Sequence, residues 1–233
     1  MKFYNLIAHL LPIPLAYLLF TQEYSEFYIL AGIVFSFLLG IYGFSVGMHH
    51  TFSHRTFSFS RPVEVALAWV SFYTLLQSPI SWSTVHKAHH KYADKAGDPH
   101  SPVILGNKVW LPWKYKLKLE RPYKKILKDP VHRFLHKNEW LLLLHPIVAA
   151  SFGINAFMFF YLMPLSYIMI LQLIFVVLSH GKIENEQGNN AQKSMLLWVF
   201  ALTDGDHEKH HKDLSCPSSH RFFANLIGNK NVR

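Results

Sequence analysis

The chain has 233 residues, of which 51% are hydrophobic and 16% charged, and its mean hydropathy is +0.14; these values exclude a disordered chain and a typical soluble domain. A single cysteine, Cys216, excludes an internal disulfide framework and a cysteine-rich zinc site. The net charge of +9 indicates a surface suited to nucleic acid, anionic lipid or an acidic cofactor.

Uncharged segments predict four membrane-spanning helices. Residues 140–181 contain no Asp, Glu, Lys or Arg, and a helix of 42 residues rises roughly 63 Å, enough for two crossings. This hairpin is expected to turn near Gly153, with Pro164 either kinking its second helix or forming an alternative turn. Residues 3–20 could be a signal peptide, but no A-x-A-like cleavage site follows. The expected spans are about 3–20, 27–48, 139–154 and 157–180.

Basic residues predict the orientation of these spans. Residues 49–139 hold 15 Lys and Arg, whereas the loop 21–26 holds two Glu and no basic residue. The positive-inside rule therefore places the basic stretch and the C-terminal arm in the cytoplasm. The densest part, Lys108–Arg133, has aromatic residues interleaved. We interpret it as a segment that contacts lipid headgroups rather than nucleic acid.

Histidine occurs 16 times, more often than Asp and Glu together, and concentrates in three groups. These are an H-x4-H pair and two H-x2-H-H triplets: His49 and His54; His86, His89 and His90; and His207, His210 and His211. On a helix, residues i, i+3 and i+4 share a face, so each triplet presents three imidazoles together. The members of the pair cannot share one face of a regular helix. Either the helix ends within the pair, or its two histidines reach different metals.

Neutral imidazole suits zinc, copper, iron and nickel. A single zinc ion takes four ligands, so eight or more histidines imply at least two metal ions. The absence of an HExxH motif argues against a zinc protease. An all-histidine site of this size at a membrane face favours two non-haem irons and oxygen chemistry. His100, in Asp98-Pro99-His100, is a candidate for orienting a ligand imidazole.

Three stretches together resemble the membrane fatty acyl desaturases of the stearoyl-CoA Δ9 type. They are HHTFSHRTF at 49–57, SPISWSTVHKAHHKYADKAGDPHSP at 78–102 and DGDHEKHH at 204–211, and their order, spacing and flanking residues agree with that family. The resemblance runs from about Phe27 to His211. It implies an all-α integral membrane protein with four spans in two hairpins. A helical cytosolic cap, residues 49–138 and 181–233, would carry the histidine boxes and hold two irons.

In that family nine histidines bind the irons. The resemblance assigns this role to His49, His54, His86, His89, His90, His180, His207, His210 and His211. His180 lies at the end of the last expected span, outside the three groups. All nine must meet on one side of the membrane, so the apolar segment 63–80 cannot cross and is expected to be an interfacial helix.

The resemblance also implies the reaction and its partners. We expect the O2-dependent introduction of a cis double bond into a saturated acyl chain, carried as acyl-CoA, acyl lipid or acyl-ACP. Because no haem or ferredoxin domain is fused to the chain, we expect a separate electron-donor protein of the cytochrome b5 or ferredoxin type. Trp82 and Gln77 are candidates for shaping the tunnel that holds the acyl chain.

Five positions depart from the family pattern. Val176 stands where the family usually has an Asn that helps one iron through water. Asp206 replaces an aromatic residue and Glu208 replaces an Asn, so either could act near the metals. Thr84 and Val85 stand where the acyl-CoA enzymes carry an Arg and an Asp that touch CoA. These last two changes weaken the case for a CoA ester and leave acyl lipid or acyl-ACP open.

Three other functions remain open on the sequence. A di-iron hydroxylase acting on a lipid or alkyl chain uses a related histidine scaffold, usually with different box spacing. A histidine-rich metal transporter should carry its ligands inside the membrane rather than at helix ends. An inactive lipid-binding relative would keep the fold without the chemistry.

Overall fold

A computed structural model describes residues 8–110, 120–197, 205–214 and 220–230. Within these residues the regular structure is helical, with two isolated bridges, His180 to Ala191 and Lys193 to Asp206, and no strand. The prediction of an all-α fold is confirmed for this part of the chain. Cys216 and the first residues of the expected span 3–20 lie outside the described residues.

Two helices are long and apolar enough to cross a membrane, Glu26–His54 and Ile154–Leu178. The first consists of α3 (Glu26–Leu38) and the π-helix η1 (Leu39–His54). The second consists of α10 (Ile154–Phe157), the π-helix η4 (Met158–Leu162) and α11 (Met163–Leu178). They correspond to the expected spans 27–48 and 157–180.

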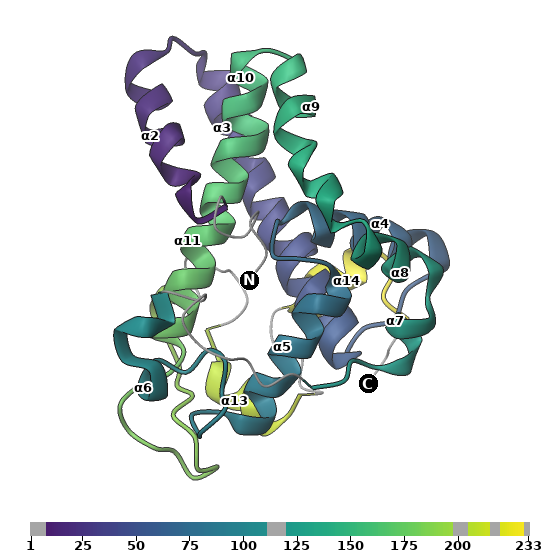
Figure 1. The fold of residues 1–233 in the computed structure, drawn as a ribbon, viewed down its shortest axis with the longest axis vertical. Coiled ribbons are helices and arrows are strands. Elements are labelled where there is room, and N and C mark those ends of the chain that lie inside the picture. The colour runs from purple at the N-terminus through teal and green to yellow at the C-terminus, as the bar shows by residue number, and fades with distance from the viewer. Residues whose placement is uncertain (1–7, 111–119, 198–204, 215–219, 231–233) are drawn as a thin grey trace.

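The other two expected spans are shorter helices. Apolar helices cover Ala8–Thr21 and Glu139–Ser151, each less than the roughly 20 residues that a crossing needs. They contain α2 (Pro12–Thr21) and, in the second case, η3 (Glu139–Leu143) followed by α9 (His145–Ser151). In Figure 1, α2, α3, α9 and α10 stand side by side as the upper bundle. The described residues thus contain two helices of spanning length rather than four.

The second hairpin turns where the sequence predicts. α9 ends at Ser151, and Gly153 has φ 97°, a left-handed conformation that only glycine adopts readily. Pro164 lies inside the continuous helix Ile154–Leu178, at the point where the π-helix η4 gives way to α11. The helix therefore continues through this proline. Pro164 is therefore not the turn.

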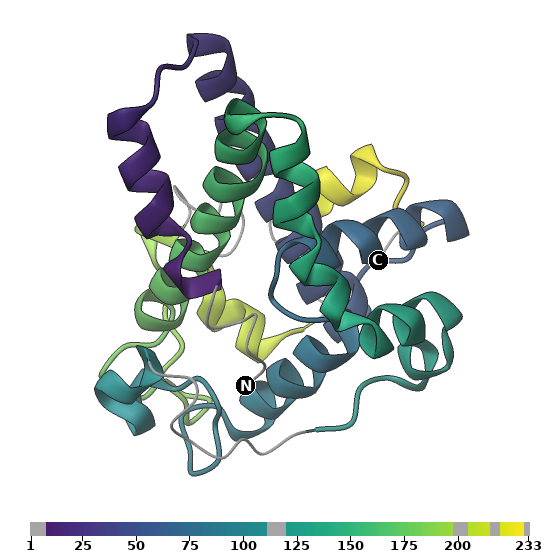
Figure 2. The same cartoon turned by 45° about the horizontal axis from the view of Figure 1, so that its top comes forward.

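The remaining helices pack at the lower end of this bundle, as Figures 1 and 2 show. They are α4 (Arg61–Tyr73), α5 (Pro79–Tyr92), α6 (Pro102–Leu105), η2 (Gly106–Trp110), α7 (Lys124–Lys128), α8 (Pro130–Lys137), α13 (His207–Lys212) and α14 (His220–Leu226). Several of them, including α4, α5, α6 and α8, carry proline at the first or second helical position. Because the fixed φ of proline suits a helix start, the sequence marks where these helices begin.

The helix expected over 63–80 is shorter than predicted. α4 ends at Tyr73, and α5 begins at Pro79 after a turn in which Leu75 and Gln77 have φ of 60° and 87°. Its 13 residues rise roughly 20 Å, too little to cross a membrane. The interfacial position of α4 stays a prediction.

Close packing of α4 on η1 sets the position of the first histidine pair. Ser71 Oγ donates a 2.7 Å hydrogen bond to the carbonyl of Gly43. A Cβ atom at Gly43 would lie 2.9 Å from Thr74 Cγ2 and 3.0 Å from the carbonyl oxygen of Val70. The backbones can approach this closely only because Gly43 has no side chain.

A buried carboxylate fixes the start of α5, the helix that carries the second histidine group. Glu139, 2% exposed, accepts hydrogen bonds from the Ser78 N–H at 3.1 Å and from Ser81 Oγ at 2.7 Å. Ser78 is also the N-cap residue, and its side chain accepts the Ser81 N–H. Glu139 in η3 therefore fixes the position of the α5 N-terminus.

We expect Glu139→Ala to lower the free energy of unfolding by roughly 2–4 kcal/mol, because it leaves buried donors without their charged acceptor. Thermal unfolding in detergent measures this change. Glu23→Ala, a change at an exposed carboxylate, is the control. Equal melting temperatures for the two variants would contradict the role of Glu139.

Candidate metal centre

Nine histidines lie together at the lower end of the bundle, in two groups whose ligand nitrogens are within 4.8 Å of one another. The first group is His49, His54, His86, His90 and His210. The second group is His89, His180, His207 and His211. These are the nine residues that the sequence singles out, and their role as metal ligands stays a proposal. His180, distant from the boxes in sequence, follows the end of α11 and joins because its ring contacts those of His89 in α5 and His207 in α13.

Facing nitrogens within each group have the separation expected around a shared metal ion. In the first group, His86 Nε2 lies 2.8 Å from His54 Nε2 and 3.1 Å from His90 Nε2. In the second group, His207 Nε2 lies 3.2 Å from His180 Nε2 and 3.0 Å from His211 Nε2. Metal–imidazole bonds of about 2.0–2.1 Å place neighbouring nitrogens roughly 2.9–3.4 Å apart.

Hydrogen bonding between rings does not satisfy this arrangement. His210 Nε2 lies 2.9 Å from His49 Nε2 and 3.2 Å from His90 Nε2. A ring nitrogen carries either one proton or one lone pair, so it cannot pair well with two neighbouring nitrogens. A cation at the centre of each group would accept all the lone pairs at once. The donor set therefore fits a metal that imidazole binds well, including iron.

The π-helix η1 brings His49 and His54 into the same group. Hydrogen bonds in a π-helix run from i to i+5, so residues five apart lie one above the other. The side chains follow this period, since Thr51 Oγ1 donates to the carbonyl of Val46 at 2.6 Å. The rings of His49 and His54 are 4.9 Å apart. The helix therefore does not end within the pair, and both histidines belong to one group. That they bind the same metal stays a prediction.

Each triplet is divided between the two groups. In α5, His86 and His90 are one turn apart and belong to the first group, whereas His89 belongs to the second. α13 repeats this division in reverse, with its outer two histidines in the second group and its middle one in the first. The three histidines of each triplet do share a helix face, as expected, but this face lies between the two histidine groups. Both short helices therefore link the two groups.

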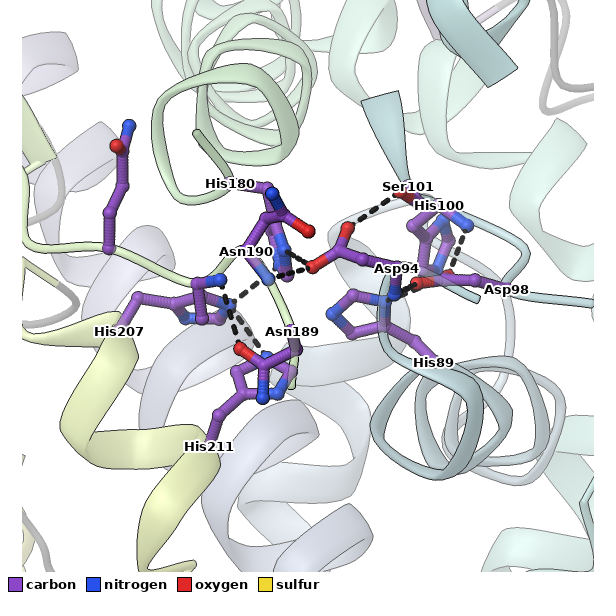
Figure 3. Close-up of polar contacts among 12 residues, drawn as sticks. His89, Asp94, Asp98, His100, Ser101, His180, Asn189, Asn190, His207 and His211 are labelled. Carbon is purple, nitrogen blue, oxygen red and sulfur yellow. Dashed lines mark hydrogen bonds and ion pairs between the residues drawn. The ribbon is translucent and has the colours of Figure 1, made fainter. Parts of the chain in front are cut away.

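Two carboxylates orient histidines of the second group, as Figure 3 shows. His89 Nδ1 donates to Asp98, whose oxygens lie at 2.9 and 3.0 Å. His180 Nδ1 donates to Asp94 Oδ2 at 2.7 Å. A hydrogen bond at Nδ1 fixes the ring and leaves the Nε2 lone pair for a metal.

Asp94 and Asp98 are themselves held ionised. Burial opposes ionisation of Asp94, but hydrogen bonds from His180, from Ser101 Oγ at 2.6 Å and from the Asn190 N–H at 2.7 Å lower its pKa to about 2. Burial likewise opposes ionisation of Asp98, and the His89 ring and two backbone N–H groups lower its pKa below the usual value. Both anions increase the basicity of the ring they contact.

Sequence reasoning missed Asp94, and it proposed His100 rather than Asp98 as the residue that orients a ligand imidazole. The ring of His100 lies 5.6 Å from that of His89, and it is the His100 backbone N–H that donates to Asp98, at 2.8 Å. The available signal was the pair of acidic residues, four apart, directly after the second histidine group in a chain with only 14 Asp and Glu.

Burial and mutual repulsion keep four of these histidines neutral. Burial, followed by the charges of neighbouring histidines, lowers the pKa of His86, His90, His207 and His211 well below the usual 6.5. The rings therefore present lone pairs rather than protons at neutral pH.

A small cavity of about 30 Å³ adjoins both groups. Its lining residues are Phe44, His49, Trp82, His86, His89, His100, Gln172, Phe175, Val176, Ser179, His180 and His207. Trp82 stacks on His86, with ring centroids 4.4 Å apart and an interplanar angle of 16°. Gln77 is not among the lining residues; it lies in the turn between α4 and α5, and its substrate role stays a prediction.

Three of the departures noted in the sequence have defined places. Val176 lines the cavity with an apolar side chain. Asp206 precedes α13 and lies 3.6 Å from Lys193 Nζ, and neither Asp206 nor Glu208 belongs to either histidine group.

Comparison with known proteins decides the family. The model of the fatty acid desaturase family matches residues 27–231, which contain all nine histidines. The chain belongs to the fatty acid desaturase family. Its assignment to the stearoyl-CoA Δ9 type stays a prediction.

Curated members of the desaturase family align with parts of the chain. The hex-5-enoyl-[acyl-carrier protein] acetylenase of Moorena producens (strain JHB) is 40% identical over 31% of this chain and 23% of its own length. The acyl-CoA 5-desaturase AL21 of Anemone leveillei is 30% identical over 51% of this chain and 38% of its own length. Stearoyl-CoA desaturase 5 of Bos taurus is 32% identical over 44% of this chain and 33% of its own length. The aligned parts thus span well under half of these relatives.

We expect Asp98→Asn to weaken Fe(II) binding at the second group by tenfold to a hundredfold, because an amide orients the His89 ring poorly. Iron retained after dialysis against a series of chelator concentrations measures this loss. Asp129→Asn, at a carboxylate paired with Arg61, is the control. Full iron retention by Asp98→Asn would contradict the orienting role.

The metal-free protein should lose stability on acidification. The folded histidines stay neutral while the unfolded chain binds protons below pH 6.5, so stability is constant above that pH and falls below it. Melting temperatures between pH 7.5 and 5.5 measure the slope. The double variant His207→Gln, His211→Gln should show a shallower decline, and a steeper or equal one would exclude these groups as its cause.

Proposed function

We propose that this protein is a fatty acyl desaturase that introduces a cis double bond into a saturated acyl chain, using O2 and two irons. The observation that carries the proposal is the pair of linked histidine groups beside a cavity that is partly lined by aromatic side chains, in a chain of the desaturase family. His49, His54, His86, His90 and His210 would hold one iron, and His89, His180, His207 and His211 the other.

Bound iron, reduced from outside, would activate O2 for removal of hydrogen from an unactivated chain, a step that side chains cannot perform. The reaction balances as –CH2–CH2– with O2, two electrons and two protons, giving –CH=CH– and two waters. The electrons would come from a separate donor protein of the cytochrome b5 or ferredoxin type.

The residues around the cavity would position the chain and keep water out. Phe44 lies against His49, with rings 6.4 Å apart, and Phe175 meets His207 edge-on at 4.9 Å. With Trp82 they form an aromatic wall beside the ligands. A wall of this kind confines an alkyl chain so that one pair of carbons faces the metals.

The same proposal sets the protein in a membrane. Helices Glu26–His54 and Ile154–Leu178 would cross it, with Ala8–Thr21 and Glu139–Ser151 completing two hairpins that extend through flanking residues. Membrane lipids would then surround the helices. The histidine groups would lie on the cytoplasmic face, on the same side as the basic residues 49–139. Relatives named for acyl-CoA and acyl-carrier-protein substrates support a fatty acyl substrate, with its carrier left open.

Expression in a host that supplies reductant, followed by gas chromatography of fatty acids, tests the proposal. We expect new unsaturated chains in the wild type and at least a hundredfold less in His89→Gln, because removal of one ligand disrupts a centre. His9→Gln, a change at a histidine outside both groups, is the matched control. Hydroxylated products would indicate a hydroxylase instead, and the absence of product from an iron-loaded wild type would overturn both.

A further inference from the structure

One polar side chain in the cavity has no part in the histidine groups. Gln172 lies on α11, six residues before the helix ends at Leu178, and so about 9 Å from that end along the helix, away from the ligands. Its Oε1 is buried and accepts no hydrogen bond within the described part of the chain. Val176 and Phe175, which line the cavity between Gln172 and His180, are apolar.

A buried amide oxygen is unfavourable unless it has a hydrogen-bond donor. The free space in the cavity, about 30 Å³, has room for about two water-sized spheres, so an acyl chain that enters must displace lining side chains as well as water. Water in this space can satisfy Gln172, whereas methylene groups pressed against it cannot. The amide therefore opposes any alkyl chain that extends as far as Gln172 and displaces that water.

The direction of a bound chain follows from polarity. CoA, a carrier protein or a lipid headgroup is too polar to enter the apolar helical bundle, so it must remain near the lower end, where the histidines lie. The methyl end of the chain then points along α11, past Val176 and toward Gln172.

Resting on the desaturase function proposed above, we propose that Gln172 is a specificity-determining residue that closes the acyl cavity and selects short acyl chains. The preferred chain ends before Gln172 and leaves its hydrated amide in place. Longer chains bind poorly because they bury the amide without a partner.

Binding of saturated acyl thioesters, hexanoyl through stearoyl on one small carrier group, tests this independently of turnover. Dissociation constants are measured on the metal-loaded full chain in detergent. The wild type should bind its preferred short thioester at least tenfold more tightly than palmitoyl. Gln172→Leu should remove most of this preference, because a leucine side chain accepts methylene groups.

Two further variants keep the outcome interpretable. Gln172→Met gives a flexible apolar side chain if the leucine variant does not fold, and it should also favour long chains. Gln22→Leu makes the same change at an exposed position and should bind as the wild type does. Equal affinity for all chain lengths in the wild type, or an unchanged preference in both Gln172 variants, would overturn the proposal.

The binding experiment also separates this proposal from the desaturase function. Length-dependent binding without unsaturated product would leave Gln172 as the selector and refute only the reaction. Product formed equally from hexanoyl and palmitoyl chains would support the reaction and refute the selector.

Discussion

Buried imidazole rings repel one another as soon as they take up protons, and this electrostatic constraint governs the histidine centre. Nine rings lie close enough for their nitrogens to approach 3 Å, and burial with mutual repulsion lowers the pKa of His86, His90, His207 and His211. Repulsion of this kind opposes the close approach of the rings. The geometry of the centre must come from the surrounding scaffold, which includes the carboxylates of Asp94, Asp98 and Glu139.

Departures from regular α-helical geometry place the ligands. The π-helix η1 aligns His49 with His54, and Gly43 lets the same helix approach α4. The surroundings of the two groups differ. Carboxylates contact His89 and His180 of the second group, whereas Trp82 stacks on His86 of the first. Both groups adjoin the same cavity, so hydrogen bonds to carboxylates hold rings on one side of the centre only.

Much of the fold could be predicted from local sequence. The uncharged runs located the long helices, Gly153 marked the hairpin turn, and prolines marked several helix starts. Helix lengths were less predictable: the apolar segment 63–80 is interrupted after Tyr73, and two of the four expected spans form short helices. A hydropathy pattern does not reveal the turn at Leu75 and Gln77, where φ is positive, because both side chains are uncharged.

The sequence by itself determined which histidines gather, because their spacing on short helices leaves few other arrangements, and a resemblance added His180. Only the tertiary structure decided how they divide. Adjacent residues His89 and His90 enter different groups, and their partners come from η1, α13 and the chain that follows α11, which no local pattern relates to α5. The contacts of Asp94 and the place of Gln172 in the cavity were decided in the same way. The function of a carboxylate or an amide depends on which hydrogen-bonding partner long-range packing places against it, or on the absence of such a partner.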